Sequence, residues 1–79
     1  MEKKNEHPIK SKMRNFVLER IEDASGVSGT GIVAEGVEFT DGTAIIRWLT
    51  HYTSTCVYEN MKAVEAIHGH EGRTVVRWL

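Results

Sequence analysis

The sequence feature that most constrains the fold is the Asp41-Gly42 pair, which stands between two runs of apolar and β-branched residues. Asp-Gly in this setting predicts a β-hairpin, because a type I′ turn needs a positive φ at both central residues. We expect the flanking strands over 32–39 and 44–49. Gly36, inside the first strand, predicts a bulge or a close approach of backbone.

Three more segments have the pattern of β-strands and complete the expected sheet. They are residues 15–22, 55–58 and 73–79, in which apolar and polar side chains roughly alternate. Apolar residues at helical spacing, followed by Gly69, predict one short helix over about 61–68. The expected fold class is therefore α+β: a small antiparallel sheet of four to five strands, with one short helix before the last strand.

Length and charge predict a single domain with a basic tail. The chain has 79 residues and a net charge of -1. Residues 1–14 are rich in Lys and poor in apolar side chains, so we expect a flexible basic tail, with a single β-rich domain over 15–79. The balanced charge argues against binding long nucleic acids. No apolar run approaches a membrane span, the N-terminus does not resemble a signal peptide, and Cys56 is the single cysteine, so we expect no membrane partner and a cytoplasmic location.

The small size of the expected domain also predicts association. About 65 residues build a marginal core when no disulfide or metal cage supports it. Pairing with copies of the same chain buries further surface. We therefore expect a homo-oligomer.

Two of the expected strands share a repeated sequence motif. Residues 42–49 and 72–79 share the pattern G-x-x-[IV]-[IV]-R-W-L. On each strand Trp lies on one face and Arg on the other. Trp48 and its counterpart therefore form a tryptophan face that serves as core or stacks on a base. Arg47 and Arg77 either bind an anion or cover the outer face with their alkyl stems.

A glycine- and serine-rich segment precedes the second expected strand. Its amides and hydroxyls, at Ser25, Gly26, Ser28, Gly29 and Thr30, are of the kind that cradles phosphate. The segment lacks the Lys-Ser/Thr of a Walker loop and the spacing of a dinucleotide-binding fingerprint. An ordinary hairpin connection remains the alternative.

The His68-Gly69-His70-Glu71 cluster allows three interpretations. The imidazoles bind zinc, stabilise the end of the helix, or hydrogen-bond a ligand. No CxxC motif or well-spaced further ligand supports zinc, so we expect neither a metal nor a cofactor. Cys56 lies in an apolar run typical of an inert thiol, and no nucleophile–base pair stands out, so we expect no enzymatic activity.

Residues 16–79 resemble a family of small proteins encoded by phages and bacteria. The shared pattern is F-V-L-x-R-x-x-D-x-S-G-x-S-G-T-G-x-V-A-E-G-x-x-F-x-D-G-T, then R-W, then H-G-H-x-G-x-T. In size and phage setting the family is similar to viral sponge proteins of the anti-CBASS type. Those proteins sequester the cyclic nucleotide signals of antiphage defence without cleaving them. The resemblance implies a location in the host cytoplasm.

The leading hypothesis is a non-catalytic, oligomeric protein that sequesters a phosphate-bearing small molecule, expected to be a cyclic oligonucleotide immune signal. The alternative is a protein-interaction module that captures and modulates a host protein, for example by strand addition. The candidate ligand-binding residues are Ser25, Gly26, Ser28, Gly29, Thr30, Arg47, Trp48, His68, His70, Arg73 and Arg77.

Overall fold

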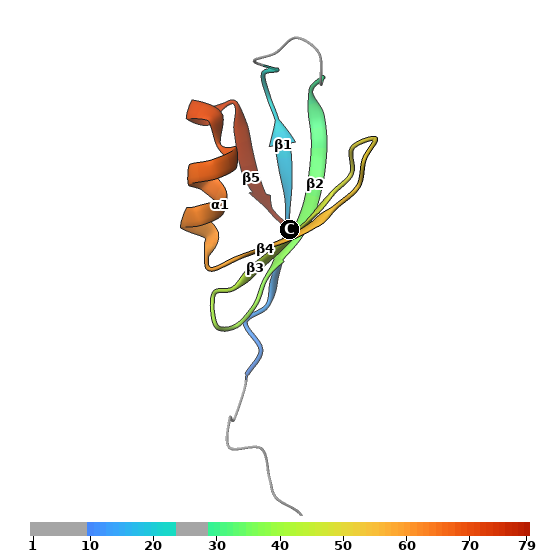
Figure 1. Cartoon of the computed structure of the whole chain (residues 1–79). Helices are drawn as coiled ribbons and strands as arrows, with labels where there is room; N and C mark the ends of the chain where they lie inside the picture. The colour runs from blue at the N-terminus through green and yellow to red at the C-terminus, as the bar shows by residue number, and fades with distance from the viewer. Residues whose placement is uncertain (1–9, 24–28) are drawn as a thin grey trace, which may run out of the picture.

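The computed structural model describes residues 10–23 and 29–79, which form a five-stranded antiparallel sheet and one α-helix (Figure 1). The order of the strands in the sheet is β4-β3-β2-β1-β5, so β4 and β5 form its two edges. The expected architecture, with one short helix before the last strand, is confirmed. The elements are β1 (Arg14–Arg20), β2 (Gly31–Glu38), β3 (Ala44–Trp48), β4 (Thr55–Tyr58), α1 (Met61–His68), a 3₁₀ turn (His70–Gly72) and β5 (Thr74–Trp78).

The predicted hairpin joins β2 to β3, but its turn differs from the predicted type. Gly42 has φ 95°, whereas Asp41 keeps a negative φ. The amide of Gly42 donates to the carbonyl of Phe39 (2.9 Å), and the amide of Phe39 donates to the carbonyl of Thr43 (2.7 Å). One positive φ at the glycine is typical of a three-residue loop with a G1 bulge, so the type I′ prediction was wrong. The Asp41 carboxylate accepts from the Thr43 amide (2.9 Å), which lowers the pKa of Asp41.

The sheet has two different faces because paired residues on neighbouring strands point the same way. On the inner face, Phe16, Leu18 and Ile46 are fully buried, and Val64 of α1 packs against them. The tryptophans of both repeats share this face, since Trp78 pairs with Phe16 and Trp48 pairs with Ala34. The arginines of both repeats lie on the opposite face, which we call the open face because α1 packs on the other one.

Gly36 permits the closest packing in the sheet. A Cβ at this position would lie 2.4 Å from the Phe16 ring and 2.8 Å from the carbonyl oxygen of Ile45. The close approach predicted from the sequence is therefore present. Gly36 is not the site of a bulge: the register shift in the β1–β2 pairing lies between Leu18 and Glu19.

Local signals fix the ends of α1. Asn60 caps its start, because the side-chain oxygen accepts from the amide of Ala63 (2.9 Å). The helix ends before Gly69 as predicted, although Gly69 has φ -67°, and the left-handed residues are His70 and Glu71. A Cβ on Gly69 would approach the carbonyl oxygen of Glu65 to 2.5 Å, so space explains the glycine better than φ does.

The expected tail is described in part. Residues 1–9 lie outside the described residues, and Arg14, at the end of the expected tail, is the first residue of β1. The amide of Lys12 donates to the Thr40 hydroxyl (2.9 Å), next to the β2–β3 turn. Over residues 10–23 and 29–79, no helix has the length and apolar character to cross a membrane.

Candidate functional site

Arg47 is held in a polar setting on the open face. Its guanidinium donates to the hydroxyls of Thr55 (2.9 Å) and Thr53 (3.1 Å). Thr55 is the direct cross-strand neighbour of Arg47 on β4, and Thr53 lies in the loop just before that strand. Both acceptors are neutral, and in the described part of the chain no carboxylate forms an ion pair with Arg47. The full positive charge is therefore available to an anion, while the threonines limit its rotamers.

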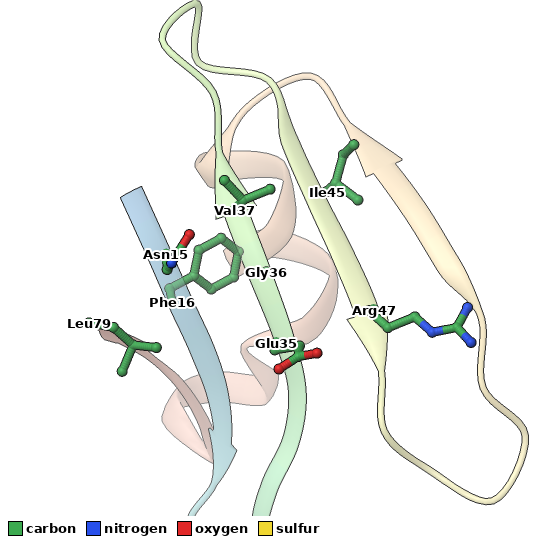
Figure 2. Close-up of a pocket in the computed structure, with 8 residues that line it drawn as sticks. All are labelled: Asn15, Phe16, Glu35, Gly36, Val37, Ile45, Arg47 and Leu79. Carbon is green, nitrogen blue, oxygen red and sulfur yellow. The ribbon is translucent and has the colours of Figure 1, made fainter. Parts of the chain in front are cut away.

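A hollow of about 330 Å³ adjoins Arg47 on the open face (Figure 2). Its lining includes the backbone of Gly36, where a side chain would collide with the Phe16 ring and the Ile45 carbonyl. Its size is at the lower end of the range for small-molecule sites. The lining residues are Asn15, Phe16, Glu35, Gly36, Val37, Ile45, Arg47 and Leu79.

Opposite charges occupy paired positions beside the hollow. Glu35 and Arg47 are Cα partners on β2 and β3, and both side chains are exposed. Figure 2 shows Arg47 extended toward β4 while Glu35 stays over β2, so the two groups diverge. The site thus offers, on one side, a guanidinium that donates two of its five N–H groups to threonines and, on the other, a carboxylate that only accepts.

The remaining arginines of the described chain have other contacts. Arg77 donates to Glu19 (2.8 Å), and Arg73 lies 3.8 Å from Glu22. The Arg14 guanidinium stacks over the Trp78 ring at 3.9 Å. The Arg20 guanidinium donates to the carbonyl of Gly29 (3.5 Å). Of the three candidate arginines Arg47, Arg73 and Arg77, Arg47 is therefore the one without a carboxylate partner among the described residues.

Arg77 nevertheless shares a row with Arg47 across the sheet. Arg77 pairs with Val17, Val17 with Glu35, and Glu35 with Arg47. Three strand spacings separate the two arginines, about 14 Å. Both face the same side, as the repeat predicts, but the hollow includes only Arg47.

The predicted histidine and tryptophan ligands lie on the inner face. His68 Nε2 and the Tyr58 hydroxyl are 2.6 Å apart, and the His68 ring packs edge-on against Trp48 at 4.8 Å. Burial lowers the pKa of His68, with a smaller contribution from His70, and burial raises the pKa of Tyr58. Neutral forms therefore dominate this cluster at pH 7. His70 is exposed beyond the helix end, so the structure does not bring these side chains to Arg47.

The glycine-rich segment is only partly described. Ser25, Gly26 and Ser28 lie outside the described residues. The Gly29 amide donates to the Asp23 carboxylate (2.6 Å), and Thr30 is exposed just before β2. Gly31, where β2 begins, is four residues from Glu35, or about 13 Å along the strand. The described end of this segment therefore lies apart from the hollow.

Several residues that line the hollow or hold Arg47 beside it were not predicted from the sequence. Thr53 and Thr55 orient Arg47, and Glu35 and Asn15 line the hollow beside it. One signal was available: the alternation of strand residues places Thr55 on the face of its strand that does not carry Cys56 and Tyr58. The strand pairing that brings Thr55 beside Arg47 could not be derived from the alternation alone.

Metal-binding chemistry has no visible support in the described residues. No three or more His, Cys, Asp or Glu side chains come close enough together there to hold a metal ion. Cys56 is half-buried and is not part of a disulfide. Arg47, its two threonine acceptors and the hollow have the chemistry of a cationic site, since a guanidinium forms charge-assisted hydrogen bonds with anions.

The fold and the site define a small α+β protein with a hollow beside an exposed arginine on the sheet face that α1 does not cover. The match to a family model is more specific. Residues 13–79 match the model of the Acb5 phage protein family, and the chain belongs to that family. Membership in this anti-CBASS family indicates a role in phage counter-defence. No curated protein and no solved structure matches the chain.

Proposed function

We propose that this chain is a non-catalytic, oligomeric binding protein that sequesters a cyclic oligonucleotide immune signal in the host cytoplasm. The observation that carries the proposal is Arg47, an exposed guanidinium oriented by two neutral hydroxyls beside a hollow of about 330 Å³. A phosphodiester is the anion that matches such a fork, since Arg binds phosphate with two parallel hydrogen bonds. The phage anti-CBASS family supplies the biological setting.

The rest of the hollow fits the other parts of a nucleotide. Val37, Ile45 and Leu79 give it an apolar side on which a sugar or base can pack. Asn15 and Glu35 add hydrogen-bonding groups. Such a mixture of apolar walls with few polar groups is typical of small-molecule sites.

Tyr52 is the aromatic side chain that we assign to base stacking. It is 85% exposed and lies in the same loop as Thr53, next to the hydroxyl that holds Arg47. Trp48 and Tyr58 pack against His68 and the core on the inner face, so they do not face the hollow. Base–aromatic stacking contributes about 1–3 kcal/mol per base, which makes Tyr52 a useful second variant.

Calorimetric titration with a panel of cyclic di- and trinucleotides tests the proposal. We expect binding by the wild-type protein and a roughly 10- to 150-fold weaker affinity for Arg47→Gln, from the loss of about 1.5–3 kcal/mol of charge-assisted hydrogen bonding. Lys62→Gln, which removes an exposed positive charge on α1, is the matched control and should bind like wild type.

Recovery of the ligand separates sequestration from catalysis. After long incubation and denaturation of the complex, the cyclic nucleotide should return chemically intact. Cleaved product would refute the non-catalytic assignment. No binding across the panel would refute the proposal itself and favour the alternative, a module that captures a host protein.

A further inference from the structure

We infer that the free edge of β5 pairs with β5 of a second copy, antiparallel and across a two-fold axis near Val76. The inference deepens the proposed function by naming the surface through which copies join, and it rests on the oligomeric part of that proposal. It makes no use of the hollow, so the two can fail separately. The contacts of β5 with its neighbours carry the argument.

The backbone of β5 presents unpaired groups at the end of the sheet. The amide of Leu79 donates to Asn15, and the carbonyl of Arg73 accepts from Ile21, so the odd-numbered residues face β1. In an antiparallel pair the alternate residues then point away from the partner. The amides and carbonyls of Val76 and Trp78 therefore face outward, while the Thr74 amide is bonded to the carbonyl of Gly69 (3.1 Å).

This edge lacks the features with which sheets usually prevent pairing. Those features are Pro, Lys, a bulge or an inward-pointing charge. β5 is the five residues TVVRW, and its register with β1 runs from Phe16–Trp78 to Arg20–Thr74 without a shift. Its one charge, Arg77, faces the open side and is paired with Glu19. A regular, β-branched edge of this kind is a template for another strand.

Charges on the inner side of the edge make β5 complementary to itself. A second hollow, of about 420 Å³, runs along β5 from Thr74 to Trp78 beside α1, and its acidic lining residues are Glu65 of α1 and Glu71, three residues before Thr74. At the other end of the strand, Arg14 lies over the Trp78 ring. An antiparallel pairing about Val76 sets Trp78 of one copy opposite Thr74 of the other. The Arg14 of each copy is thereby brought to the acidic hollow of its partner, twice per dimer.

The geometry of this dimer keeps both open faces on one side. Its two-fold axis is perpendicular to the sheet, so the ten strands form one continuous sheet and both α1 helices lie on the same side of it. Val76 pairs with its own counterpart through two hydrogen bonds, and each Trp78 amide donates to the Thr74 carbonyl opposite. A second copy thus satisfies both outward groups of Val76 and the outward amide of Trp78, while the Thr74 amide keeps its bond to Gly69.

Sedimentation equilibrium on the full chain, with a charge-reversal cycle, tests the inference. We expect the wild type to dimerise, Arg14→Glu and Glu71→Arg each to raise the dimer dissociation constant at least tenfold, and the double variant to recover most of the loss. Glu59→Arg, the same charge change at the start of the α1 segment, is the control and should dimerise like wild type.

Two outcomes would overturn the inference. One is a monomeric wild type at about 100 µM, a concentration at which even a weak edge interface is populated. The other is a dimer that neither single reversal weakens, which would place the interface on β4 or on the open face. If Arg14→Glu fails to fold, as judged by circular dichroism, Val76→Pro replaces it. That change deletes the outward amide without removing a β1 hydrogen bond, and a dimer that survives it also overturns the inference.

Discussion

Replacement of Gly36 by alanine tests the packing of the sheet most directly. The added methyl would lie 2.4 Å from a carbon of the Phe16 ring and 2.8 Å from the carbonyl oxygen of Ile45, well inside the 3.4 Å at which ordinary contact begins. The ring is fully buried and the oxygen belongs to the β2–β3 ladder, so neither can move away without a wider shift.

The magnitude follows from two opposing effects. Overpacking of a well-packed core costs about 1–3 kcal/mol. Alanine offsets about 0.5–1 kcal/mol of this, because glycine in a strand loses more backbone entropy on folding. We therefore expect Gly36→Ala to lower the free energy of unfolding by about 1–2 kcal/mol. A domain of this size has only about 3–5 kcal/mol in total, so the melting temperature should fall by roughly 4–8 °C per kcal/mol.

Urea denaturation followed by circular dichroism measures the loss. Glu35→Ala, at the adjacent exposed position, is the control and should stay within about 0.5 kcal/mol of wild type. In a Phe16→Leu background the smaller side chain relieves part of the clash, so the cost of Gly36→Ala should shrink. A Gly36→Ala protein as stable as wild type would refute the reasoning, and an undiminished cost in the Phe16→Leu background would refute the role of the ring.

Three further changes test other parts of the fold. Thr74→Val should raise the free energy of unfolding by about 1 kcal/mol in a urea titration, because the buried Thr74 hydroxyl has no hydrogen-bond partner among the described residues; a loss of stability would contradict this. Asn60→Ala should cost about 1 kcal/mol, since the Ala63 amide loses its acceptor, and α1 should fray first in hydrogen exchange. Acidification should destabilise the protein through His68. Burial holds its folded pKa below the ordinary 6.5, so the unfolded chain binds more protons and stability falls as the pH drops through 6.5 toward the folded pKa. Stability measured between about pH 7.5 and 5.5 should show this fall, and His68→Gln should reduce it.

The fold could be predicted because its signals are local. The Asp-Gly hairpin, the alternation of the strands and the spacing of the helix are properties of neighbouring residues. The turn type was wrong for a physical reason: in this loop one positive φ, at Gly42, is enough to reverse the chain. The separation of tryptophans and arginines onto two faces also follows from the period of a strand, and the structure confirms it.

The site was less predictable because it depends on how distant strands pair. Arg47 was a candidate from the repeat, but its threonine acceptors come from the β3–β4 pairing and the loop before β4. Arg77 was an equal candidate in the sequence, and only the structure shows it paired with Glu19. The hollow itself is lined by residues of β1, β2 and β3 and by Leu79 after β5, a grouping of distant segments that no local pattern encodes.

The placement of both indoles beneath the sheet has a practical consequence for spectroscopy. Trp48 and Trp78 are the only two tryptophans of the chain, and both lie on the side away from the hollow. Tryptophan fluorescence should therefore stay nearly constant when a ligand binds beside Arg47. Trp78, 38% exposed on β5, should instead change its emission when two chains join or separate. Tryptophan fluorescence should therefore report dimerisation while changing little when a ligand binds.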